Sequence, residues 1–150
     1  MVPAAPASAV PAAPASKALL LDRLTVRDDR IVCELSLAPQ APRTTTPQLA
    51  ARVRASFPDI GRHACINDEG PTFAAVIDHT SLAHLLEHLV IELEVRAAPK
   101  GAPTLVGTTE LLDAEGICAR VEVSYLDDIV ALRAFRDAAD FINGALTPGA

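Results

Sequence analysis

The feature that most constrains the fold is a wide apolar stripe in the middle of the chain. Thr80 or Ser81 can cap a helix there, and the helix is predicted to end near Ala97, before Pro99-Lys100-Gly101. Spacings of three and four residues place the apolar side chains on one helical face. So broad a face must be covered by another layer of structure. The stripe comprises Leu82, Leu85, Leu86, Leu89, Val90 and Leu93.

Alternating apolar and polar residues predict two β-hairpins, one on each side of this helix. In the first, Ile31, Cys33, Leu35 and Leu37 share one face, and Asp28-Asp29 marks the turn. In the second, residues 113–116 make the turn. The predicted strands run over residues 19–26, 31–37, 104–111 and 117–125.

Two further helices complete the pattern. Thr46-Pro47 begins one that ends before Pro58, since Thr can cap and Pro fits the first helical position. Asp127-Asp128 begins the other, which runs to about Ala145. Its predicted buried stripe is Ile129, Leu132, Phe135, Ala139 and Ile142. With a short element at 73–77, the order ββ-α-α-ββ-α predicts an α+β fold: a mostly antiparallel sheet of about four strands with helices on one face.

The chain of 150 residues is expected to hold one domain, over residues 17–150. Residues 1–16 are rich in Ala, Pro and Ser, and we expect an extended, disordered tail there. Three cysteines do not make a disulfide framework, and no secretory signal is recognisable, so a cytoplasmic location is expected.

Composition argues against two classes of partner. Thirteen lysines and arginines stand against 19 aspartates and glutamates, a net charge of -6, and aromatic residues make up only 3%. A nucleic-acid binder would show a basic stripe or stacking aromatic residues. The longest apolar run carries His84, Glu87, His88 and Glu92, which a bilayer core would penalise. We therefore expect neither nucleic acid nor membrane as a partner.

The central helix carries a candidate metal site in the sequence His84-Leu85-Leu86-Glu87-His88. Histidines four residues apart project from one helical face and can share a tetrahedral zinc ion. Glu87 lies beside them and could act as general base toward a water molecule. This is the H-x-x-E-H pattern of inverted zinc peptidases. The triad lies roughly opposite the leucine stripe, so we expect it to be open to solvent or to a partner.

The third protein ligand is left open by the sequence. Glu92, one turn further along, is too far up the helix to bind the same ion, but it could orient His88 from behind. The later candidates are Cys118, Glu122, Asp127 and Asp128, among which Asp128 is weakly favoured. Alternatively, His63 and Cys65 could join His84 and His88 in a four-ligand structural zinc site.

Several stretches together resemble the N-terminal domain of cyanophycin synthetases. The Pro58 turn precedes a His63-Ala64-Cys65 motif, and residues 80–93 match the family's His-x-x-Glu-His helix. Residues 121–128, followed by an Ala-rich helix, match its closing strand and helix. The resemblance covers roughly residues 31–142.

This resemblance implies a fold similar to one half of the pitrilysin-type peptidases. In the large synthetases the domain binds the Asp-Arg polymer, and in some it also trims that polymer at a zinc-peptidase-like site. By this resemblance His84 and His88 match the metal ligands and Glu87 the catalytic glutamate. No ATP-grasp or Mur-ligase-like part follows, which implies a free-standing relative. The family's two arginines are replaced at Thr108 and Glu110, and a glutamate at Ser124.

Three functions remain open. The first is a zinc-dependent hydrolase of peptide or isopeptide bonds, acting on a cyanophycin-like polymer or a basic peptide, which the negative net charge would attract. The second is a non-catalytic module that binds a polymer or a protein. The third is a structural zinc protein. Pitrilysin-like sites are closed by a second half, so a homodimer is also expected.

Overall fold

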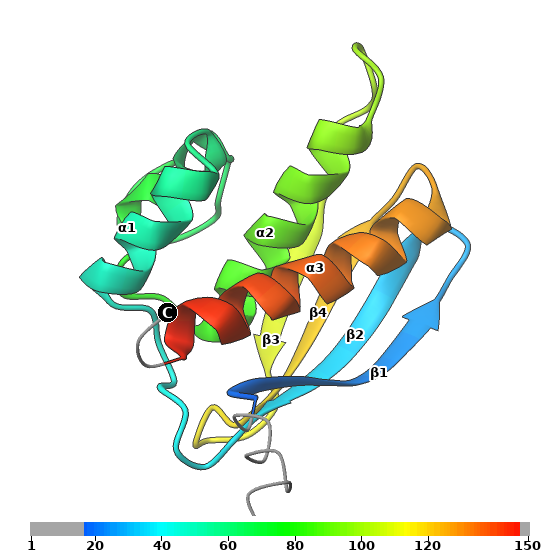
Figure 1. Cartoon of the computed structure of the whole chain (residues 1–150). Coiled ribbons are helices and arrows are strands. Elements are labelled where there is room, and N and C mark those ends of the chain that lie inside the picture. Colours follow the sequence, from blue (N-terminus) through cyan, green and yellow to red (C-terminus); the bar gives the residue numbers. More distant parts are fainter. Residues whose placement is uncertain (1–16, 148–150) are drawn as a thin grey trace, which may run out of the picture.

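The structure, a computed structural model, describes residues 17–147 and places them in one four-stranded sheet with three α-helices packed on it (Figure 1). The tail predicted at residues 1–16 lies outside the described residues. The strands are β1 (Leu19–Val26), β2 (Arg30–Leu37), β3 (Gly107–Leu111) and β4 (Cys118–Ser124). The helices are α1 (Pro47–Ser56), α2 (Leu82–Ala97) and α3 (Asp128–Leu146), and short 3-10 turns lie at Ile60–Arg62 and Phe73–Ala75.

All neighbouring strands of the sheet are antiparallel, in the order β1-β2-β4-β3. The predicted α+β class and antiparallel sheet are therefore confirmed. The register explains the core: Cys33 lies between Leu24 of β1 and Val121 of β4, and the residues at alternate positions of β2 are buried. Because side chains alternate across a strand, one face of the sheet is apolar and receives the helices.

Helices α2 and α3 cover this face side by side. Helix α2 contacts β3 and β4, and α3 contacts β1 and β2. Helix α1 and the 3-10 turns lie on the other side of α2 from most of the sheet (Figure 1). The predicted caps are present: the hydroxyl of Thr46 accepts from the backbone N–H of Leu49, and the carboxylate of Asp127 accepts from that of Ile129.

Two local predictions need correction. Ile129, predicted buried, is 53% exposed. The predicted stripe of α3 is confirmed at Phe135, Ala139 and Ile142, and the buried face also includes Ala131, Ala134 and Ala138. Small side chains on that face let α2 and α3 approach closely. Strand β3 begins at Gly107 rather than at Thr104. Cys118 lies in β4, within the strand predicted over residues 117–125, and it is exposed.

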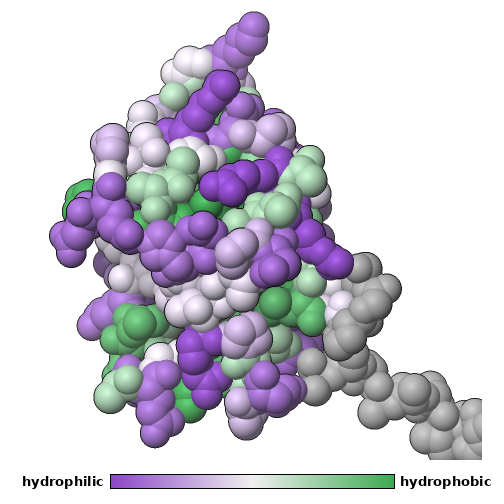
Figure 2. Space-filling model, turned by 90° about the vertical axis from the view of Figure 1, so that its left-hand side faces the viewer, coloured by the Kyte–Doolittle hydropathy of each residue, from purple (hydrophilic) through white to green (hydrophobic). Residues whose placement is uncertain are grey.

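No helix in the described part of the chain is both long and apolar enough to cross a membrane. The side of the molecule on which α1 lies shows hydrophobic residues in patches separated by hydrophilic ones (Figure 2).

Candidate metal centre

Helix α2 is enclosed on its polar face as well as on its leucine face. Glu87 is 6% exposed and His88 2% exposed, whereas the sequence pattern predicted an open triad. The covering groups come from elsewhere in the chain. The ring of Phe73 stacks on His88 with centroids 4.0 Å apart and meets His84 edge-on, and β3 covers Glu87. The expectation of an open polar face was therefore wrong for these two residues.

Two histidines and one cysteine converge in this enclosed region. Nε2 of His84 lies 3.1 Å from Nε2 of His88 and 3.4 Å from Sγ of Cys65. One ligand atom from each of the three residues lies within 4.8 Å of the other two. Cys65 reaches α2 from the loop before Phe73. In that loop its backbone N–H donates to the carbonyl of Pro71.

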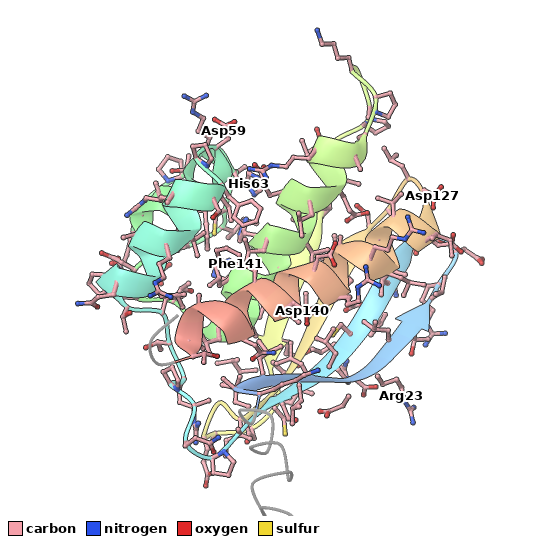
Figure 3. The ribbon with its side chains drawn as sticks, viewed as in Figure 1. Arg23, Asp59, His63, Asp127, Asp140 and Phe141 are labelled. Carbon is pink, nitrogen blue, oxygen red and sulfur yellow. The ribbon has the colours of Figure 1, made fainter. Side chains whose placement is uncertain are left out.

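Contacts at the far ring nitrogens orient both imidazoles. Nδ1 of His84 lies 2.8 Å from Oγ1 of Thr80, and Nδ1 of His88 lies 3.2 Å from Nδ1 of His63. Nε2 of His63 in turn lies 3.0 Å from a carboxylate oxygen of Glu92. Figure 3 shows His63 pointing toward α2 from the segment beside α1.

These contacts determine which nitrogen of His88 carries the proton when the rings are neutral. A carboxylate only accepts, so Nε2 of His63 must donate to Glu92, which leaves Nδ1 of His63 as an acceptor. Nδ1 of His88 must then donate to it, and Nε2 of His88 keeps its lone pair. That lone pair is directed at Nε2 of His84. Glu92 therefore acts on His88 through His63, not by direct contact.

Burial keeps the two imidazoles uncharged. It is the largest cause lowering the pKa of His88 to about 3, and the neighbouring His84 and His63 lower it further. Burial alone lowers the pKa of His84. Neutral imidazole is the form that binds a metal ion.

Glu87 lies on the same side of α2, between His88 and β3. Its Oε1 accepts a hydrogen bond of 2.7 Å from Oγ1 of Thr109, and its Oε2 lies 3.6 Å from Nε2 of His88. Gly107 makes room for this carboxylate, because a Cβ there would lie 2.7 Å from Cγ of Glu87. Burial raises the pKa of Glu87, and the Thr109 hydrogen bond opposes that shift.

The residues fit a tetrahedral zinc ion. Ligand atoms about 2.0–2.3 Å from zinc lie roughly 3.3–3.6 Å apart at tetrahedral angles, close to the observed 3.1 and 3.4 Å. The donor set of one thiol and two imidazoles suits zinc, and the facing Nε2 atoms of His84 and His88 would share a cation well. His63 lies behind His88, at the opposite ring nitrogen. It is therefore not placed as a fourth ligand.

The centre opens into a cleft of about 1350 Å³. His84, Glu87 and His88 line it from α2, and the loops at residues 59–67 and 98–106 form its walls. Cys65 and His84 are partly exposed, whereas His88 is buried, so a molecule in the cleft would approach the three residues from the side of Cys65 and His84.

The other candidates for the third ligand are not in the group that the described residues bring together. Glu122 pairs with Arg30 at 2.7 Å, and Cys118 is exposed on β4. Asp127 caps α3, and it lies across the molecule from His63 (Figure 3). Asp128, the weakly favoured candidate, begins that same helix. The residue that the structure brings to His84 and His88 is Cys65, whose sequence signal was the His63-Ala64-Cys65 motif.

Fold and site together define an α+β domain with a potential metal centre on its central helix. The family model described as cyanophycin synthase-like N-terminal domain matches residues 30–147. The chain therefore belongs to that family. No curated protein matches the chain significantly.

Proposed function

We propose that the protein is a zinc-dependent hydrolase of peptide or isopeptide bonds. The observation that carries the proposal is the convergence of Cys65, His84 and His88 beside Glu87, all four of which line one cleft. Three protein ligands with an open fourth position are typical of catalytic zinc sites, whereas structural sites are closed by four. The His-x-x-Glu-His helix beside an antiparallel sheet also supports a likeness to pitrilysin-type peptidases.

Each residue has a distinct role in this proposal. Cys65, His84 and His88 would hold the ion, and zinc when bound supplies Lewis-acid activation of a water molecule and of the scissile carbonyl. Because the hydroxyl of Thr109 donates to Oε1 of Glu87, the other oxygen, Oε2, would take a proton from that water and deliver it to the leaving amine. Its raised pKa favours such exchange. Thr109 and Gly107 position the carboxylate.

Glu92 and His63 orient a ligand in the same proposal. By fixing the proton on Nδ1 of His88, they keep its Nε2 lone pair directed into the site. A carboxylate hydrogen-bonded to a metal-binding imidazole also raises the basicity of that imidazole. Here Glu92 would act on His88 in this way through the ring of His63.

Replacement of Glu87 by Gln tests the chemistry. We expect Glu87→Gln to bind zinc and to fold as the wild type does, and to lose on the order of a hundredfold or more in hydrolysis, the scale of general-base catalysis. The substrates are Asp-Arg dipeptide polymers, simple basic peptides and apolar peptides. Glu115→Gln is the matched control, because Glu115 is exposed in the turn between β3 and β4.

Two results would contradict the proposal. Equal turnover by the wild type and Glu87→Gln would remove the glutamate from the mechanism. Purified protein that retains no zinc after supplementation and desalting would leave the non-catalytic binding module as the better description.

A further inference from the structure

The cleft above the candidate metal centre has walls rich in exposed apolar side chains. Within residues 17–147, nine large hydrophobic residues are exposed, and four of them line this one cleft. Ile66 is fully exposed and Val106 is 65% exposed. Exposed apolar groups concentrated in one place mark a binding surface. The four are Ile66, Val95, Val106 and Leu126.

These four side chains come from separate parts of the chain. Ile66 lies in the loop of Cys65, Val95 in the last turns of α2, Val106 just before β3 and Leu126 just after β4. Ile91, partly buried on α2, continues the surface toward His88. The fold therefore brings apolar side chains from four segments that are distant in the sequence to the lining of one cleft.

The cleft has few charged groups that a ligand could pair with. Glu92 is buried and contacts His63 at 3.0 Å and Arg96 at 3.7 Å. The exposed charged residues of the lining are Asp59 and Arg62, which pair with each other at 3.4 Å, and Lys100. A polymer that bears a carboxylate and a guanidinium in each repeat would therefore find few complementary charges here.

We infer that the cleft selects peptides with apolar side chains next to the bond at the metal centre, in preference to the Asp-Arg polymer. This inference rests on the proposed function for the identity of that bond. The binding surface itself does not depend on catalysis. Apolar side chains of a substrate would cover Ile66, Val95, Val106 and Leu126 and remove them from water.

The test is a binding measurement on zinc-supplemented Glu87→Gln protein, so that peptides stay intact. Two fluorescein-labelled peptides of equal length are compared by anisotropy: one of Leu, Val and Ala, and one of alternating Asp and Arg. We expect the apolar peptide to bind at least about tenfold more tightly, the scale on which hydrophobic pockets discriminate. Similar affinities, or a preference for the Asp-Arg peptide, would overturn the inference.

Matched substitutions locate the effect. Val106→Ser and Ile66→Ser should each weaken binding of the apolar peptide several-fold. Val26→Ser should leave it unchanged, because Val26 is 45% exposed on β1, outside the cleft. Equal effects of Val26→Ser and the two cleft substitutions would contradict the inference. Ile66 is fully exposed, so its substitution is not expected to disturb folding.

The result is separable from the proposed function. If the wild type hydrolyses Asp-Arg polymers and binds apolar peptides no better, the hydrolase survives and the apolar selectivity fails. If apolar peptides bind with the expected pattern but no zinc is retained, the selectivity survives and the hydrolase fails.

Discussion

Imidazole rings contact carboxylates in two places in this domain, one exposed and one buried. Exposed His79 lies between Asp78 and Glu69, with 2.6 Å from each ring nitrogen to a carboxylate oxygen. The hydrogen bond to Asp78, then the one to Glu69, raises the pKa of His79. Buried His88 behaves oppositely, since burial and two neighbouring histidines lower its pKa to about 3.

The comparison shows that environment, not residue type, determines what a histidine can bind. Two carboxylates favour the protonated ring of His79, which then has no lone pair for a metal. The enclosed ring of His88 stays neutral and presents a lone pair toward His84. Glu92 contacts His63 rather than His88, and Oε2 of Glu87 is 3.6 Å from Nε2 of His88. No carboxylate of the described residues therefore hydrogen-bonds to His88, and its ring can bind a cation. This distinction supports a metal site on α2 and none at His79.

The largest expected effect is on zinc content, when the ring of buried His88 or of exposed His79 is removed. We expect the wild-type protein to hold about one zinc per chain and His88→Ala to hold none, because two ligand atoms alone do not retain zinc. His79→Ala is the matched control and should keep the full amount. Metal analysis after desalting measures both. Loss of zinc from His79→Ala alone would reverse the assignment of the two clusters.

Substitutions of His63 and Glu92, which lie behind His88, should have a smaller effect on metal affinity. Glu92→Gln and His63→Gln leave all three ligands in place but loosen the control of the His88 tautomer. We expect zinc binding to weaken roughly 10- to 100-fold, the range for groups behind a metal ligand, with one ion per chain retained. Competition with a chelator measures the affinity, and Glu69→Gln is the control.

The cobalt-substituted protein distinguishes an orienting role for His63 from ligation. The absorption spectrum of tetrahedral cobalt should keep its shape in His63→Gln if His63 is not a ligand. A change to the spectrum of a different coordination number would show that His63 binds the metal directly.

Close packing around Glu87 predicts a loss of stability on a very small substitution. Gly107→Ala places a Cβ 2.7 Å from Cγ of Glu87, whose carboxylate is held by Thr109. Overpacking of this kind costs about 2 kcal/mol of unfolding free energy. Gly144→Ala is the contrast, because a Cβ there meets no atom within 4 Å, and alanine favours the helix. Denaturant unfolding of both variants compares the sites, and equal stability would show that Glu87 moves aside freely.

The sequence predicted the parts of the fold that depend on local patterns. Alternation identified β1 and β2, and the capping residues Thr46 and Asp127 marked helix starts, because these signals act within a few residues. The same local reasoning found His84, Glu87 and His88 on one face of α2.

What local patterns could not supply was the enclosure of that face. Phe73 and Thr109, which cover the polar side of α2, lie in segments whose docking depends on the whole fold. The candidate third ligand depends on the whole fold in the same way. The path of a loop brings Cys65 to His84 and His88, whereas element order alone favoured Asp128.

The last predicted effect concerns Glu94, a third buried carboxyl on α2 beside Glu87 and Glu92. Its side chain is 4% exposed, and Oε2 has no hydrogen-bond partner in the structure. Burial raises the pKa of Glu94 to about 7, from an ordinary value of 4.5. The folded protein therefore binds this proton more tightly than the unfolded chain does. The contribution to stability is full below about pH 4.5 and is lost as the pH rises through 7.

Glu94→Gln should remove this pH dependence, because the amide stays neutral. We expect the variant to gain about 2 kcal/mol of unfolding free energy relative to the wild type between pH 5 and pH 8. Urea unfolding at both pH values measures the difference, and the exposed Glu115→Gln should show none. A constant difference between wild type and Glu94→Gln across this range would mean that Glu94 is already ionised at pH 5. Its carboxylate would then have a partner, as Glu92 has in His63, and the contrast between paired and unpaired buried carboxylates on α2 would fail.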